Sequence, residues 1–263
     1  MKITVGIPTL NRSHSLIKLY ESLTAQTDKD FSVLVVDDGS KGNTPVPLQL
    51  DAQLYRTHPY REPGKMYDSM VPDNVIFKEA GCDVLIHLDD DGVVHPGLVA
   101  RVREQFTRFQ AQVLYGRITS VDTLDRVRIV DDDVRMKELK NHNTMFKLEP
   151  DCGFHFGAIW AAPMKVLWDM GGHDMRWIGS LGCDARLGFR LAKMLVSYFH
   201  PDPETTFTHV GLSKYRERKL GGRMTEVYEN WLAPQLSNCD NPVVANGGVV
   251  FWQNFPIRYE RLV

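Results

Sequence analysis

Three consecutive aspartates, Asp89, Asp90 and Asp91, directly follow the apolar run Val84–Leu88. An apolar run of this length predicts a buried strand that ends at the edge of a sheet, where open α/β sheets bind ligands. Adjacent carboxylates repel one another unless a cation or several hydrogen-bond donors lie among them. Clustered oxygen ligands suit Mg²⁺ or Mn²⁺, and such an ion would take a phosphate as its other partner. A solvated turn with a helix cap is the alternative interpretation.

The elements that position these aspartates are predicted by the periodicity of the apolar residues. Lys2–Ile7 and Phe31–Val36 have the pattern of buried strands, and Gln53–Thr57 that of a third, short one. Helical spacing relates Leu16, Leu19, Tyr20 and Leu23, then Val75, Ile76, Phe77 and Ala80, and after Pro96 also Leu98, Val99, Val102, Phe106 and Phe109. A strand, a helix and a strand in this order form a βαβ unit, which predicts a parallel sheet.

The second half of the chain is less regular. Val113–Val121 predicts a further strand, and Val166–Gly172 predicts a short helix that ends on glycine. Asp122–Pro150 is charged and weakly periodic, which indicates a mobile or acceptor-facing excursion. Its second aspartate triplet, Asp131–Asp133, follows no buried strand and therefore indicates a solvated turn. Asp184–Met194 again has helical spacing.

The composition is that of an ordinary soluble globular protein. The chain has 263 residues, of which 43% are hydrophobic and 24% charged, and fits one large domain or one domain with an appendage. A net charge of -2 argues against wholesale nucleic-acid binding. The four cysteines lie far apart, which predicts free thiols in a reducing compartment. No apolar run has the length of a signal peptide or a transmembrane segment, so we expect a cytoplasmic protein, with peripheral membrane contact left open.

Four motifs, taken in order, resemble those of inverting glycosyltransferases of family 2. They are Ile7–Arg12, Val35–Ser40, Ala80–Asp91, and Gly171–Asp174 leading to Gly182–Arg190. The resemblance runs from Met1 to about Tyr215. It implies the GT-A fold, a Rossmann-like α/β fold of nucleotide-diphospho-sugar transferases with a mostly parallel central sheet flanked by helices. Residues 1–215 would form this domain, and residues 216–263 a C-terminal extension with a flexible basic loop and a short helix.

The resemblance implies a nucleotide pocket after the first two strands. Pro8, Thr9, Asn11 and Arg12 would contact the donor, and Asp38 would accept hydrogen bonds from the base. A carboxylate suits this role because it only accepts hydrogen bonds and can satisfy ring N–H donors. The alternative is that an aspartate before Gly39 only forms the turn. For Asp37, this interpretation is as good as a contact with the base.

The resemblance also implies a metal site. Asp89 and Asp91 would be the Asp-x-Asp pair, with Asp91 as metal ligand, Asp89 or Asp90 reaching the ribose or a metal-bound water, and His209 as a late metal or diphosphate ligand. Mn²⁺ or Mg²⁺ would bridge the diphosphate and neutralise the charge that grows on the leaving nucleotide. Lys214 and Arg216 supply cations suited to the diphosphate.

Asp184 would be the general base that takes the proton from the acceptor hydroxyl. The start of a helix would keep this carboxylate ionised, although a helix N-cap is an equally good interpretation of the residue. Trp177 would stack on an acceptor sugar, if it is not a core residue. Cys183 stands where the family usually has an acidic residue, and Arg186 lies near a second such position, so the acceptor contacts differ from the family pattern.

The function implied is a hexosyltransferase-type reaction from a nucleotide-sugar, with UDP as the favoured nucleotide. The acceptor would be a glycan, a lipid-linked sugar, a protein or another hydroxyl. A modified DNA base is favoured only by the basic stretch Lys214–Arg223.

Three other functions compete with this one. A haloacid-dehalogenase-like phosphatase would use Asp89 as nucleophile and Asp91 as acid, but its motif belongs on the first strand. A GT-A nucleotidyltransferase would need a glycine-rich loop after the first strand, and Pro8–Asn11 is not one. A catalytically silent nucleotide-sugar-binding protein is compatible with Cys183.

Overall fold

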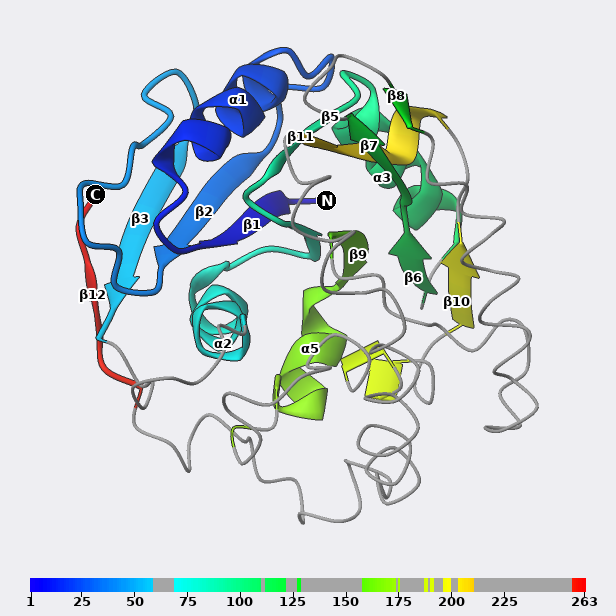
Figure 1. The fold of residues 1–263 in the computed structure, drawn as a ribbon. Coiled ribbons are helices and arrows are strands. Elements are labelled where there is room, and N and C mark those ends of the chain that lie inside the picture. Colours follow the sequence, from blue (N-terminus) through cyan, green and yellow to red (C-terminus); the bar gives the residue numbers. More distant parts are fainter. Residues whose placement is uncertain are drawn as a thin grey trace, which may run out of the picture.

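The computed structural model describes residues 1–58, 69–109, 112–121, 127–128, 158–173, 175, 187–188, 190–191, 196–199, 203–210 and 257–263. Over these described residues, the first half of the chain intersperses strands with three helices, and Figure 1 shows their arrangement. The elements are β1 (Ile3–Thr9), α1 (Ser13–Thr24), β2 (Ser32–Asp37), β3 (Ala52–Thr57), α2 (Met70–Glu79), β4 (Val84–Leu88), β5 (Gly92–Val94), α3 (Leu98–Arg108), β6 (Gln112–Tyr115), β7 (Arg117–Val121), β8 (Val127–Arg128), β9 (Ile159–Pro163), α5 (Met164–Met170), β10 (Val196–Phe199), the 3-10 helix η2 (Pro203–Thr205), β11 (Thr206–Val210) and β12 (Tyr259–Arg261).

The larger sheet has the strand order β10-β6-β9-β4-β1-β2-β3-β12. β1 is parallel to β2 and β4, β2 is parallel to β3, and β6 is parallel to β10. The predicted α/β architecture with a mostly parallel sheet is therefore confirmed. β9 is antiparallel to β4 and β6, and β12 is antiparallel to β3, neither of which the sequence predicted.

The order of the strands creates a switch point at the carboxyl end of β1. The chain passes from β1 to β2 and β3 on one side, and then places β4 on the other side of β1. Because β1 and β4 are parallel neighbours, the loops that follow them begin side by side at this edge of the sheet. Open α/β sheets bind ligands at such switch points.

Helices cover both faces of this sheet, and Figure 1 shows α1 and α2 on opposite sides of β1. The predicted apolar stripe of α1, Leu16, Leu19, Tyr20 and Leu23, is buried with α3 residues in one core cluster. Residues of α2 and α5 form a second cluster with Leu85 and Trp160. Gly6 in β1 lets α2 approach closely, because a Cβ at this position would lie 2.6 Å from Cγ2 of Ile76.

A second, smaller sheet has the strand order β5-β11-β7-β8. The prediction of one strand over Val113–Val121 is wrong, since β6 belongs to the larger sheet and β7 to the smaller one. The break falls at Gly116, where a Cβ would lie 2.3 Å from the carbonyl oxygen of Thr205. Only glycine allows the backbone before β11 to come so near.

Several predictions concern residues outside the described ranges. They include most of the Asp122–Pro150 excursion and the basic loop and short helix of residues 216–263, so the domain boundary at residue 215 stays a prediction. Within that last stretch, β12 pairs with the edge of β3, and the main chains of Leu54 and Leu262 are hydrogen-bonded. Among the described helices, none combines the length and the apolar character that a membrane span requires. The cytoplasmic location also stays a prediction.

Candidate functional site

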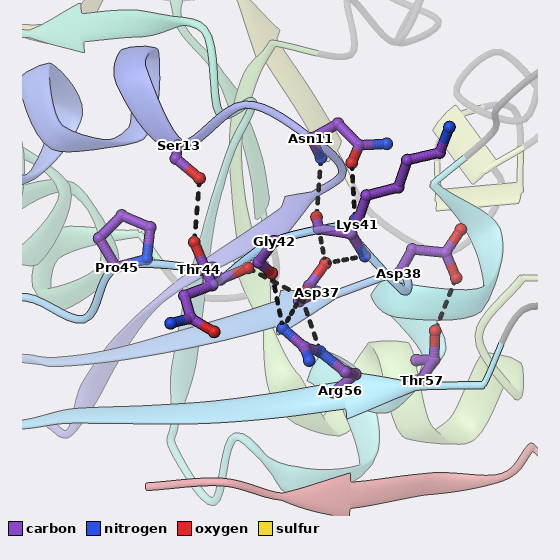
Figure 2. A network of polar contacts seen from close by, with 12 residues as sticks. Asn11, Ser13, Asp37, Asp38, Lys41, Gly42, Thr44, Pro45, Arg56 and Thr57 are labelled. Carbon is purple, nitrogen blue, oxygen red and sulfur yellow. Dashed lines mark hydrogen bonds and ion pairs between the residues drawn. The ribbon is translucent and has the colours of Figure 1, made fainter.

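The loops that follow β1 and β2 are joined by hydrogen bonds (Figure 2). The N–H of Asn11 donates to Oγ of Ser40 at 2.7 Å, and Oδ1 of Asn11 accepts the N–H of Lys41 at 2.9 Å. Asn11 has a φ of 55°, a left-handed conformation that asparagine tolerates better than most residues. The N–H of Asp38 donates to the carbonyl oxygen of Thr9 at 2.9 Å. The structure thus brings the first two predicted motifs together.

Asp37 is a structural residue that holds this loop pair. Its carboxylate is fully buried and accepts hydrogen bonds from the N–H and Oγ of Ser40 at 2.9 and 2.6 Å, and from Oγ1 of Thr44 at 2.7 Å. Arg56 on β3 donates to Oδ2 of Asp37 through Nε at 2.9 Å, and a terminal nitrogen of its guanidinium lies 2.8 Å from the same oxygen. These partners satisfy the carboxylate, which resolves the alternatives for Asp37 in favour of a turn-forming role.

Asp38 points away from Asp37 in Figure 2, toward the end of β3. Its Oδ1 accepts a hydrogen bond of 2.6 Å from the hydroxyl of Thr57, and the residue is only 3% exposed. Thr57 therefore fixes the orientation of a carboxylate at the carboxyl ends of β2 and β3. A group placed in this way can accept further hydrogen bonds without reorganising.

Polar contacts join the loop after β1 to the loop after β4. Oγ1 of Thr9 donates to Oδ2 of Asp90 at 2.7 Å, while the guanidinium of Arg12 is hydrogen-bonded to Oδ2 of Asp91. Nε of Arg12 also lies 3.9 Å from Oδ1 of Asp90. Asp91 is 7% exposed, whereas the side chain of Arg12 is 42% exposed. Residues far apart in the sequence thus meet at the switch point.

The two carboxylates carry more negative charge than Arg12 neutralises. Burial raises the pKa of Asp90 to about 6, despite the hydrogen bond from Thr9 and the charge of Arg12, and Asp91 adds to this increase. Burial alone would lower the pKa of Arg12, but the three aspartates together raise it. A site with this imbalance favours an additional cation.

Replacing Asp90 by asparagine is expected to stabilise the free protein at alkaline pH. A pKa raised from the ordinary 3.8 to about 6 means that ionised Asp90 destabilises the fold, by about 3 kcal/mol at most. This destabilisation is complete above about pH 6 and disappears as the pH falls toward the unfolded-state value. The melting temperature of Asp90→Asn should therefore exceed that of the wild type at pH 8, by at most roughly 6–12 °C, and the gain should shrink at pH 4.5.

Melting curves of Asp83→Asn provide the control for this titration. Asp83 precedes the same strand at its opposite end, is exposed, and accepts a hydrogen bond from the N–H of Lys2. Its replacement should not show the same pH-dependent gain. An Asp90→Asn protein that is equally destabilised at both pH values would contradict the raised pKa of Asp90.

The described residues suit a metal ion that is held partly by the protein and partly by the phosphates of a substrate. No group of three or more histidine, cysteine, aspartate or glutamate side chains gathers as a metal cluster in the described part of the chain. Mg²⁺ and similar ions commonly take only one or two carboxylates, and substrate phosphates complete their coordination. Asp90 and Asp91, with Asp89 before them, could supply the oxygen ligands for this kind of site.

His209 meets the aspartate loop through its backbone. It lies opposite Gly92 in the antiparallel pair of β11 and β5. Gly92 is the residue that directly follows Asp91 in the chain. A Cβ on Gly92 would lie 2.4 Å from the ring of Phe207, so glycine is needed for this close approach of the strands. The predicted late ligand is thus adjacent to the predicted metal loop in the fold.

The remaining predicted site residues, Asp184, Lys214 and Arg216, lie outside the described residues, as do Trp177 and Cys183. Pro8 is buried within β1. Sequence reasoning missed a buried group in which Asp73 of α2 lies between His87 of β4 and His173 after α5. A histidine inside a predicted buried strand was the available signal, since a buried polar group needs a partner.

Comparisons with known proteins identify a family and a fold. Residues 4–171 match the model of the family described as glycosyl transferase family 2. The structure of S. aureus TarS is similar to this chain, with a TM-score of 0.57 at 17% identity. The match covers 90% of this chain and 42% of the TarS chain. Its 1–349 fragment in complex with UDP also has a TM-score of 0.57 at 17% identity, with 82% and 63% covered.

The mannosyltransferase PcManGT from Pyrobaculum calidifontis, in complex with GDP-Man and Mn²⁺, has a TM-score of 0.55 at 16% identity. It covers 94% of this chain and 68% of its own. At these identities the likeness is one of fold, and it confirms the expected GT-A architecture. The chain spans less than two thirds of the TarS structures that it matches. No curated protein matches the sequence.

Proposed function

The chain belongs to glycosyl transferase family 2, and from this premise we propose that it transfers a sugar from a nucleotide-diphosphate donor to an acceptor hydroxyl with inversion. One observation supports this most strongly: Thr9 and Arg12 after β1 meet Asp90 and Asp91 after β4 across the switch point. Such a switch point is where an α/β sheet binds a nucleotide. Its excess of carboxylate charge suits a metal-bound diphosphate.

The donor nucleotide lies on the loops after β1 and β2 in this proposal. Pro8, Thr9 and Asn11 line the pocket, and the hydrogen bonds between Asn11 and the Ser40–Lys41 turn hold the two loops in register. Asp38 accepts hydrogen bonds from the base, and Thr57 holds its carboxylate in place. UDP is the nucleotide we favour. TarS has been solved with UDP and the mannosyltransferase with GDP-Man.

Asp91 is the principal metal ligand in this proposal, with Asp89 or Asp90 and His209 contributing. Mn²⁺ or Mg²⁺ supplies Lewis-acid stabilisation of the leaving nucleotide when it is bound. Arg12 gives up its hydrogen bond with Asp91 and turns to the diphosphate, for which a guanidinium is well suited. The half-exposed side chain of Arg12 has the freedom for this movement. Lys214 and Arg216 add further positive charge.

Asp184 is the proposed general base. It takes the proton of the acceptor hydroxyl while that oxygen attacks the anomeric carbon from the side opposite the nucleotide. The phosphatase alternative required the aspartates to follow the first strand, but they follow β4, the fourth strand in the chain. The acceptor is a glycan, a lipid-linked sugar or another hydroxyl compound.

A thermal-shift panel tests the donor site. UDP, GDP, dTDP and CDP, and the sugar donors UDP-GlcNAc and GDP-mannose, are each added with and without Mn²⁺. A ligand that binds only the folded state raises the melting temperature, by an amount that corresponds to about 2.7 kcal/mol at 100 times its dissociation constant. We expect one base to stabilise the protein in a Mn²⁺-dependent manner. If no nucleotide shifts the melting temperature, the proposed donor site is wrong.

A further inference from the structure

Asp73, His87 and His173 form a buried polar group behind the candidate site, here called the Asp73 network. Nε2 of His87 lies 2.9 Å from Oδ1 of Asp73, and Nε2 of His173 lies 3.2 Å from Oδ2. Each of the three side chains is at most 3% exposed. Burial alone would raise the pKa of Asp73, but the two imidazoles hold it well below its usual range.

Such a group is costly to maintain. A buried carboxylate loses its hydration, and well-packed apolar side chains of similar volume are often at least as stable in its place. The surroundings are apolar and aromatic: the ring of His87 stacks on Trp160 with centroids 5.0 Å apart, and that of His173 stacks on Phe77 at 5.7 Å. The Asp73 network is therefore better explained by the geometry that it imposes than by its contribution to stability.

The network joins three elements, one of which leads directly to the aspartates. His87 is the second-to-last residue of β4. Leu88 ends the strand, and Asp89 is the next residue in the chain. Asp73 lies on α2, and its neighbour Asn74 binds the backbone of His173 twice. Oδ1 of Asn74 accepts the N–H at 2.7 Å, and Nδ2 donates to the carbonyl oxygen at 3.1 Å. The position of His173 is thus fixed relative to β4.

His173 belongs to the turn that ends α5. Gly171 and Gly172 have φ angles of 78° and 68°, in the left-handed region that glycine adopts without strain. The guanidinium of Arg190 is hydrogen-bonded to the carbonyl oxygens of Met170 and Gly172. Leu187, Arg190 and Leu191 are helical. The turn therefore connects the Asp73 network to the chain that follows Asp184.

We propose that Asp73, His87 and His173 are positioning residues, which fix the turn Gly171–His173, and through Arg190 the helical residues 187–188 and 190–191, relative to the metal-binding aspartates. This inference rests on the proposed function. The reaction requires a base on one side of the sugar and a metal on the other, and their separation must be held closely. A misplacement of about 1 Å can lower a rate 100-fold.

His173→Phe tests the inference, because phenylalanine keeps a ring against Phe77 but removes the contact with Asp73. His173→Gln is the conservative variant, since its amide can donate to Asp73. Turnover is measured as nucleotide release from UDP-GlcNAc and GDP-mannose with Mn²⁺, with water as acceptor, so that no acceptor need be known. The dissociation constants of UDP and GDP are measured in parallel, as are the melting temperatures.

We expect His173→Phe to bind nucleotide within about twofold of the wild type while its kcat falls between about tenfold and 100-fold. His173→Gln should recover much of the lost rate. Phe77→Leu is the matched control, because it destabilises the same cluster without removing a polar contact. Its kcat per folded molecule should stay near that of the wild type.

Two results would overturn the inference, and they are distinguishable. A His173→Phe protein that is destabilised but turns over at the wild-type rate would show that the network only stabilises the fold, and the proposed function would survive. A wild-type protein that neither binds UDP or GDP nor releases nucleotide would remove the proposed function and the inference with it.

Discussion

Asp91→Asn should abolish the Mn²⁺-dependent part of nucleotide binding. Asp91 is almost buried in the loop after β4, where it is hydrogen-bonded to Arg12, and in the proposed complex its carboxylate would bind the metal instead. An amide keeps the shape of the side chain but removes the charge that the cation requires. Because changes to groups behind a metal ligand already lower metal affinity 10–100-fold, we expect the loss of the ligand itself to cost at least about 100-fold. Titration calorimetry with UDP and GDP, with and without Mn²⁺, measures this loss.

The fold should tolerate this replacement. Asp91 pairs with the half-exposed Arg12, and ion pairs with exposed groups contribute little to stability. Asp83→Asn, at the opposite end of the same strand, is the control and should bind nucleotide like the wild type. An Asp91→Asn protein with unchanged Mn²⁺-dependent affinity would exclude Asp91 as the principal ligand.

Asp184→Asn should have the opposite profile, in which donor binding is preserved and transfer is lost. A general base acts only as the acceptor proton leaves, so its removal lowers kcat without changing the nucleotide affinity. General-base catalysis typically contributes between about 100-fold and 10,000-fold, and we expect a loss in this range. Nucleotide release from the sugar donor measures the rate, and calorimetry measures the binding.

Equal loss of binding and turnover in the Asp184→Asn protein would contradict its assignment as base and indicate a structural N-cap. Asp169→Asn is a suitable control. Asp169 is an exposed aspartate on α5 that pairs with Lys165, four residues earlier on the same helix. Its replacement should change neither quantity.

Local patterns in the sequence predicted the elements that carry the site. The stripe Leu16, Leu19, Tyr20 and Leu23 identified α1, and the apolar run before Asp89 identified β4. These predictions succeeded because both elements bury a continuous apolar surface, which imposes a fixed period on the residues. Gly171 ends α5 in a left-handed conformation, as its position after the apolar residues indicated.

Local patterns could not predict contacts between residues that lie far apart in the sequence. The hydrogen bonds of Thr9 to Asp90 and of Arg12 to Asp91 depend on β4 lying beside β1, which no local period encodes. The division of Val113–Val121 depends on the backbone at Thr205, whose approach Gly116 permits. The Asp73 network was missed for the same reason. Its three members come from different elements, and each alone resembles an ordinary helix, strand or turn residue.

The central claim is that the aspartate loop after β4 binds a metal together with a nucleotide diphosphate. The most direct test is a crystal structure with Mn²⁺ and UDP, or with the nucleotide that the thermal-shift panel selects, in which anomalous scattering locates the manganese. We predict one anomalous peak within coordination distance, about 2.2 Å, of a carboxylate oxygen of Asp91, with diphosphate oxygens on the same ion. A bound nucleotide with its manganese elsewhere, or with no manganese at all, would contradict the account.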